Sequence, residues 1–146
     1  MTVKIKLLKK AAELPKYATP GSAACDLRAV IDTPIDIEPG ARALIPTGIA
    51  IELPSSDYVA LICARSGLAF KRGLGLANGI GVIDSDYRGE LCVALLNSSS
   101  EVQRIENGER IAQLMIMPVA IADFEIAKDL DETERGAGGF GSTGVK

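Results

Sequence analysis

Short apolar runs rich in Val and Ile recur along nearly the whole chain, separated by clusters of Pro, Gly, Asn and Asp. Runs of this length between turn residues are typical of β-strands, and helical periodicity is nearly absent. We therefore predict an all-β fold, either a sandwich, a jelly roll or a barrel. The predicted strands span residues 3–8, 24–30, 43–53, 58–65, 79–83, 90–97, 102–105, 110–119 and 122–127, and residues 67–72 are expected to form a short helical turn.

The run 111–119 (IAQLMIMPV) is apolar on both alternating faces of the predicted strand. A strand with two apolar faces is buried on both, so this one is expected at the centre of the fold or against another subunit. From Lys128 onward a charged stretch leads into GAGGFGSTG, which is too rich in Gly to pack a core. We predict a β-barrel domain over residues 1–127 and a mobile C-terminal arm over 128–146.

Charge and composition exclude several classes of protein. The 146 residues contain 16 Lys and Arg against 19 Asp and Glu, a net charge of −3, so no broad basic surface for nucleic acid is expected. No segment approaches the roughly 20 apolar residues that span a bilayer, and the N-terminus lacks a signal-peptide pattern. Three dispersed cysteines in apolar sequence suit reduced thiols, which favours a cytoplasmic protein.

The chain contains no His, which removes the commonest general base and zinc ligand. Any hydrolytic chemistry must then rest on carboxylates. Asp84 and Asp86 stand at a tight turn directly after an apolar strand, followed by Tyr87. Because Asp is also an ordinary turn former, these residues alone leave a purely structural role open.

Arg65-Ser66-Gly67 follows a predicted strand and opens the predicted helical turn. Backbone N–H groups, a hydroxyl and a guanidinium that converge at a helix start suit a phosphate. A Ser cap beside a solvated Arg is an equally open interpretation of the tripeptide. Near the C-terminus, Arg135 and Phe140 within the Gly-rich stretch favour a nucleotide-closing arm over a plain linker.

Taken in order, these segments resemble the motifs of the homotrimeric dUTPases, and the match runs from Ala24 to Gly144. The matching stretches are ACDLRA at 24–29, ARSGLA at 64–69, GVIDSDYRGE at 81–90, GERIAQL at 108–114 and RGAGGFGSTG at 135–144. Cys25 and Ala64 depart from the family's usual residues. The resemblance implies a distorted jelly-roll β-barrel, a threefold homotrimer with shared active sites, and an arm that closes over a neighbouring site.

By this resemblance the protein is expected to hydrolyse dUTP to dUMP and pyrophosphate, lowering dUTP and supplying dUMP for thymidylate synthesis. The resemblance implies that Asp84 activates the water that attacks the α-phosphorus. It also implies that Tyr87 packs on the deoxyribose and excludes a 2′-hydroxyl. Uracil is expected in a hairpin over residues 78–92, bound by the Asn78 side chain and by backbone groups around Val82, Ile83 and Cys92.

The same resemblance assigns the rest of the triphosphate site. The α- and β-phosphates are expected at Arg65, Ser66, Gly67 and Gln113. Mg²⁺ is expected to arrive with the substrate and to touch Asp26 through a water. In the arm, Phe140 is expected to stack on uracil, and the remaining substrate contacts are expected from Arg135, Gly141, Ser142 and Thr143.

Three other classes of protein remain to be weighed against this one. A dCTP deaminase is similar in fold and has an Arg-Ser pair, but Ser typically follows where this chain has Gly67. A catalytically silent interaction module with the same fold would not need Asp26, Asp84 and Tyr87. A sugar-binding jelly roll is disfavoured because the chain has three Tyr, three Phe and no Trp.

Overall fold

The computed structural model describes residues 1–139 of the 146-residue chain and consists mainly of short strands. Each strand contains apolar residues, and several strands end at or just before a Pro, Asn or Asp. The strands are β1 (Lys4–Leu7), β2 (Cys25–Arg28), β3 (Ile35–Ile37), β4 (Arg42–Pro46), β5 (Ile49–Glu52), β6 (Tyr58–Cys63), β7 (Leu74–Leu76), β8 (Gly81–Ile83), β9 (Cys92–Asn97), β10 (Gln103–Ile105) and β11 (Arg110–Pro118), and the helix is α1 (Ser66–Arg72).

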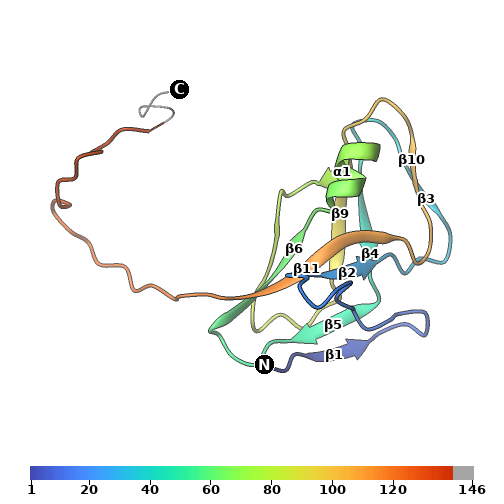
Figure 1. The fold of residues 1–146 in the computed structure, drawn as a ribbon, viewed down its shortest axis with the longest axis horizontal. Helices are drawn as coiled ribbons and strands as arrows, with labels where there is room; N and C mark the ends of the chain where they lie inside the picture. The colour runs from blue at the N-terminus through green and yellow to red at the C-terminus, as the bar shows by residue number, and fades with distance from the viewer. Residues whose placement is uncertain (140–146) are drawn as a thin grey trace.

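These strands form a four-stranded sheet in the order β2-β11-β6-β8 and a three-stranded sheet in the order β4-β9-β7. Two further two-stranded sheets, β1-β5 and β10-β3, complete the fold, and every strand pairing is antiparallel. Figure 1 shows the strands surrounding one interior, with α1 at one end. The predicted all-β fold is confirmed, and within residues 1–139 no helix is long and apolar enough to cross a membrane.

The interior is filled by aliphatic side chains from both sheets. Along β9, Val93, Leu95 and Asn97 point inward while the residues between them are half-buried, as a period of two requires. Ile45 of β4, Leu74 of β7 and Ile105 of β10 belong to the same core. The buried Asn97 amide is satisfied because it donates to the carbonyls of Ile37 and Glu101.

The prediction of one continuous strand over residues 43–53 is wrong, because Thr47 and Gly48 interrupt it between β4 and β5. Gly48 has φ +69°, and a Cβ atom there would lie 2.8 Å from Cβ of Ala12. Its N–H donates to Oε1 of Glu90 at 2.7 Å. β4 therefore ends here, and the chain enters β5, which pairs with β1 instead.

Three other predictions about strands also fail. β3 and β7 were missed, because three residues are too few to show an alternation. Residues 122–127 form no strand and are fully exposed, with Phe124 at 98%. Figure 1 shows this segment leading away from the sheets after β11, where no strand from residues 1–139 lies beside it.

The expected hairpin over residues 78–92 is wrong as well. β8 pairs with β6, whereas β9 pairs with β4 and β7. The segment between them therefore crosses from one sheet to the other. By contrast, β11 lies between β2 and β6, which confirms the central position predicted for residues 111–119. Burial on both faces is not observed at the end of this strand, where Met117, Pro118 and Val119 are exposed.

Candidate functional site

Three neighbouring strands bring a carboxylate, an amide and a thiol to one surface. Gln113 of β11 stands opposite Asp26 of β2 on one side and opposite Cys63 of β6 on the other. Residues directly opposite each other in antiparallel strands project from the same face of the sheet. A pocket opens over these three side chains, and its lining is completed by Ala18, Ser22, Ala23, Ala24 and Met115.

The Asp26 carboxylate lies between two arginines. Its Oδ2 accepts a hydrogen bond from Nη1 of Arg110 at 3.2 Å. Its Oδ1 lies 2.9 Å from Nε of Arg65, but this N–H does not point at the oxygen, so the contact is an ion pair without a hydrogen bond. Both atoms are buried, and buried polar atoms without a hydrogen bond are unfavourable. Both atoms lack contact with solvent, so a polar ligand reaches them only after a shift of either side chain.

Within residues 1–139 no three acidic or cysteine side chains converge as a set of metal ligands. Asp26 is thus a single carboxylate with one unbonded oxygen. Such an oxygen can accept a hydrogen bond from the hydration shell of Mg²⁺, which retains most of its waters in proteins. A metal ion at this position needs further ligands from another molecule.

Helix α1 begins directly after Arg65, the residue that forms the ion pair with Asp26. Arg65 is the residue before the first helical residue, and its carbonyl accepts from the Ala69 N–H at 2.9 Å. No described side chain caps the first turn, so a Ser66 cap is excluded as the reason for this sequence. Ser66 and Gly67 are exposed, and a Cβ atom at Gly67 would meet nothing within 4 Å. The first-turn amides are therefore open to an anion.

The acidic turn follows β8 and is held by local hydrogen bonds. The Tyr87 N–H donates to the Asp84 carbonyl at 3.2 Å, and the Tyr87 hydroxyl donates to the Glu90 carbonyl at 3.1 Å. The Tyr87 ring lies so close to Gly89 that a Cβ atom there would stand 2.3 Å from the hydroxyl. Asp84 itself is exposed, so its carboxylate faces solvent from a fixed backbone.

The residues expected to bind a pyrimidine lie on both sides of this turn. Asn78 is exposed at the turn before β8, where the Ile80 N–H donates to its carbonyl at 2.8 Å. Val82 is exposed and Ile83 is half-buried on β8, while Cys92 begins β9. Burial, followed by the charge of Glu90, raises the pKa of the Cys92 thiol. At neutral pH this thiol is therefore protonated and unreactive.

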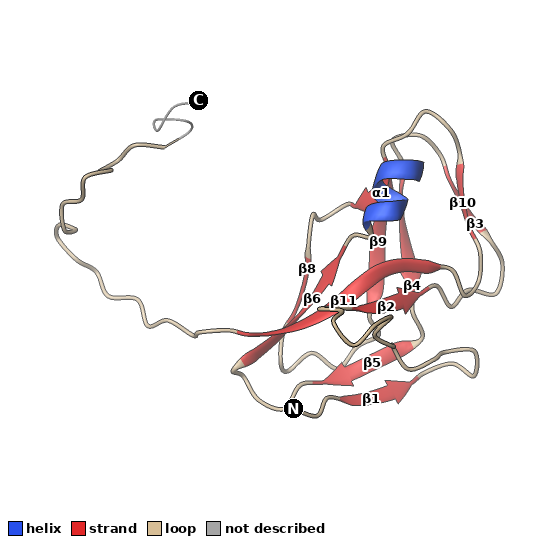
Figure 2. Ribbon diagram, viewed as in Figure 1, coloured by secondary structure: helices blue, strands red, loops and turns tan. Residues whose placement is uncertain are grey.

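The described residues thus form two groups within one chain. Asp26, Arg65, Ser66, Gly67 and Gln113 lie around β2, β11 and the start of α1, whereas Asn78, Val82, Ile83, Asp84, Tyr87 and Cys92 lie around β8 and the start of β9. β2 and β8 are the opposite edges of the four-stranded sheet, three strand spacings or roughly 14 Å apart. Figure 2 shows β6 leading to α1.

Of the site residues predicted in the C-terminal arm, the structure describes only Arg135. Arg135 is exposed, and its Nε donates to the Gly138 carbonyl at 2.9 Å. Phe140, Gly141, Ser142 and Thr143 lie outside the described residues. The roles expected for these five residues stay predictions.

Sequence reasoning missed two residues of the site. Arg110 contacts Asp26, and Gly89 leaves room for the Tyr87 ring. Both stand within the stretches that carried the resemblance, but no spacing in the sequence predicts these contacts, because each depends on how distant strands or a local turn are arranged.

Comparison with known proteins agrees with the geometry. The dUTPase family model matches residues 10–144. A deoxyuridine 5′-triphosphate nucleotidohydrolase of Desulfitobacterium hafniense is 55% identical over 99% of this chain and 98% of its own. A protein of the same name from Ralstonia pickettii is 51% identical over 99% of this chain and 97% of its own sequence.

Among solved structures, a dUTPase of Staphylococcus bacteriophage 80alpha with dUpNHpp superposes with a TM-score of 0.87 and 31% identity. It covers 99% of each chain. The likeness therefore extends over the whole fold, including the strands that carry both groups of site residues.

Proposed function

The chain belongs to the dUTPase family, and on that premise we propose which of its residues hydrolyse dUTP to dUMP and pyrophosphate. This reaction lowers dUTP and supplies dUMP for thymidylate synthesis. It requires a water aligned with the α-phosphorus, groups that neutralise the triphosphate, and contacts that select uracil and deoxyribose. The two groups of residues described above match these needs.

Asp84 is the proposed general base. It accepts a proton from the water that attacks the α-phosphorus, and the pyrophosphate leaves from the opposite side. Its exposed carboxylate on a turn fixed by the Tyr87 N–H supports this role. Help from a positioned base typically accelerates such a step by ~10²–10⁴-fold.

The α- and β-phosphates are proposed to bind at the start of α1. The open amides of Ser66 and Gly67, the Ser66 hydroxyl and the Gln113 amide supply neutral donors, and Arg65 supplies positive charge. Donors fixed before the reaction stabilise charge that develops in the transition state. The unbonded Nε of Arg65 supports a ligand at this position.

Magnesium is proposed to enter with the triphosphate and to rest near Asp26. The unbonded, buried Oδ1 of Asp26 fits a water in the magnesium shell. When bound, the ion neutralises charge on the phosphate oxygens. Asp26 then orients a water of that shell, while Arg110 holds the other carboxylate oxygen in place.

Uracil and deoxyribose are proposed to bind around β8. Asn78 and the backbone of Val82, Ile83 and Cys92 offer the donors and acceptors that read a pyrimidine edge. Tyr87 packs on the sugar and excludes a 2′-hydroxyl. The turn that exposes Asn78 and the tight fit of Tyr87 against Gly89 support this arrangement.

We further propose that each site is shared between copies in a homotrimer. A base must lie within about 3 Å of the water that it activates, but Asp84 follows the end of β8 that pairs with Ala60, whereas Arg65 lies beyond the opposite end of β6. The exposed segment 119–131 carries Ile121, Phe124, Ile126 and Leu130, whose burial a second copy would provide. The arm with Arg135 and Phe140–Thr143 is proposed to close over a neighbour's site. The free cysteines Cys25, Cys63 and Cys92, none of which forms a disulfide within residues 1–139, support the predicted cytoplasmic location.

The alignment of Asp26 and Gln113 beside Arg65 is the observation that carries the proposed residue roles. The direct test incubates the protein and Mg²⁺ with dUTP, dCTP, dTTP and UTP in turn, and measures pyrophosphate and ammonia. Pyrophosphate from dUTP alone is expected. Ammonia from dCTP would instead identify a deaminase and contradict the proposal.

A further inference from the structure

Helix α1 is fastened at both ends to the same segment, residues 103–110. At its start, Nη1 of Arg65 donates to the Arg110 carbonyl at 3.2 Å. At its end, Arg72 contacts three residues of that segment. We propose that Arg72 is a positioning residue that sets the distance between the amides of α1 and the Asp26 carboxylate. This inference rests on the proposed function, because it concerns the same phosphate site.

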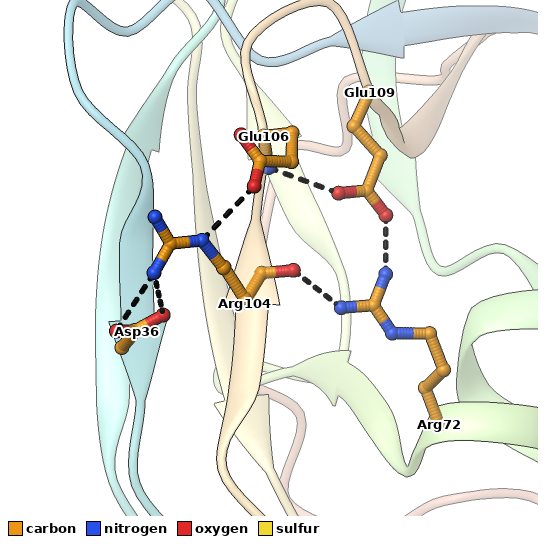
Figure 3. Close-up of polar contacts among 5 residues, drawn as sticks. All are labelled: Asp36, Arg72, Arg104, Glu106 and Glu109. Carbon is orange, nitrogen blue, oxygen red and sulfur yellow. Dashed lines mark hydrogen bonds and ion pairs between the residues drawn. The ribbon is translucent and has the colours of Figure 1, made fainter.

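The contacts of Arg72 use every nitrogen of its guanidinium. Nε donates to Oε1 of Gln103 at 2.9 Å, and Nη2 donates to the Arg104 carbonyl at 2.6 Å. Nη1 forms an ion pair with Oε1 of Glu109. Figure 3 shows Arg72 reaching from α1 to the Arg104 carbonyl and to the Glu109 carboxylate. The guanidinium spreads its donors over three nitrogens, whereas Lys presents its three donors from a single nitrogen, so Lys cannot make all of these contacts at once.

The Glu109 carboxylate, which pairs with Arg72, is fixed by a second contact. The other oxygen of Glu109 accepts from the Glu106 N–H at 3.1 Å. The side chains of Arg72 and Glu109 are 30% and 24% exposed, so solvent screens this pair less than a surface pair. Glu109 directly precedes Arg110, which binds Asp26. Arg72 therefore connects the end of α1 with the backbone that holds the proposed magnesium ligand.

Little else fixes the position of this helix. α1 has seven residues, fewer than an isolated helix needs to be stable in water. Leu68 is its only buried residue, and Phe70 is 91% exposed. The end of α1 is capped by Gly73 with φ +63°, whose carbonyl accepts from Ser98. Polar contacts at its two ends therefore hold this helix in position, whereas a longer helix would be held mainly by an apolar face.

A neighbouring arginine provides the matched control. Arg104 is 56% exposed, and its side chain pairs with Asp36 and Glu106, away from α1 (Figure 3). Arg72 uses only the carbonyl of Arg104, which survives a side-chain substitution. Arg104→Ala thus removes two ion pairs from the segment 103–110 without releasing the helix.

The test compares wild type, Arg72→Ala, Arg72→Lys and Arg104→Ala in the full chain. For each variant, kcat and KM for dUTP, the Kd of dUpNHpp and the inhibition constant of deoxyuridine are measured. Tm is measured as well. Because α1 faces only the phosphates, Arg72→Ala is expected to lose up to about 100-fold in kcat/KM and to weaken dUpNHpp. Deoxyuridine, which lacks phosphates, should bind as before.

Arg72→Lys should show a smaller loss of the same kind, and Arg104→Ala should match wild type. If dUpNHpp and deoxyuridine weaken equally, or if the Arg72→Lys kinetics equal those of wild type, Arg72 has no positioning role. Arg72→Lys decides the matter if Arg72→Ala does not fold. A wild-type protein that fails to hydrolyse dUTP would instead contradict the proposed function, so the two failures are distinguishable.

Discussion

Asp26 Oδ1 lies 2.9 Å from Nε of Arg65, and neither of these buried atoms makes a hydrogen bond. Taking two charges out of water is costly unless hydrogen bonds satisfy them. The side chains are 15% and 22% exposed as wholes, but these two atoms have almost no contact with solvent, so water does not satisfy them. We interpret the pair as a site kept ready for a phosphate oxygen and a hydrated ion.

Asp26→Asn should weaken the response of hydrolysis to magnesium. The amide removes the negative charge while it preserves the shape of the side chain. The Mg²⁺ concentration for half-maximal rate is expected to rise by about 10–100-fold, the usual effect of losing an outer-sphere partner. A magnesium titration of dUTP hydrolysis measures it. Asp36→Asn, an exposed acid on β3, is the control, and an unchanged titration for Asp26→Asn would remove Asp26 from the metal site.

Gly89→Ala should relax the selection against UTP. The new methyl would stand 2.3 Å from the Tyr87 hydroxyl, so the ring must move away from its place beside the sugar. Overpacking of this kind typically costs about 1–3 kcal/mol. The ratio of kcat/KM for dUTP to that for UTP should fall. Gly21→Ala, where a Cβ atom meets nothing within 4 Å, should leave the ratio unchanged. An unaltered ratio in Gly89→Ala would contradict the role of Tyr87.

Alkylation of Cys92 should require a higher pH than alkylation of an ordinary thiol. Burial disfavours the thiolate, and the Glu90 charge disfavours it further, so both raise the pKa. Only the thiolate reacts, so the labelling rate at pH 7–8 is expected to lie below that of a free Cys peptide. Mass spectrometry after iodoacetamide treatment across a pH series measures this. A midpoint at or below that of the peptide would contradict the assignment.

Mixing two inactive variants should restore activity if the site is shared. Arg65→Ala disables the residues that bind phosphate, and Asp84→Asn disables the proposed base, which lies beyond the other end of the β6-β8 pair. In cyclic trimers that form randomly from equal amounts, about one quarter of the sites combine both intact groups. The variants are unfolded together, refolded and assayed with dUTP. A mixture as inactive as its components would show that one chain supplies the whole site.

Much of the fold could be predicted because the apolar runs of β6, β9 and β11 are long and regular. β3 and β7 were not predictable, because a run of three residues carries no period. The break at Gly48 depends on its contacts with Ala12 and Glu90, which stand far away in the sequence. Residues 122–127 have the composition of a strand but no partner strand in the described chain.

In the candidate site, too, local sequence patterns predict some features, whereas contacts between residues far apart in the sequence determine the others. Asp84, Tyr87 and the stretch from Arg65 to Gly67 could be proposed as site residues because each stands in a compact motif that resembles the family's. The contact of Arg110 with Asp26 and the reach of Arg72 to Glu109 join positions that only the fold brings together. Local patterns therefore identify the chemical groups, while the arrangement of the strands determines which groups cooperate.

Asp84→Asn tests the central claim most directly. An amide of the same shape cannot accept a proton from water, whereas the contacts of Arg65, Ser66 and Tyr87 with the substrate remain. The Kd of dUpNHpp should therefore stay near that of wild type, while the rate of pyrophosphate release from dUTP falls by ~10²–10⁴-fold. Turnover equal to wild type would contradict the account.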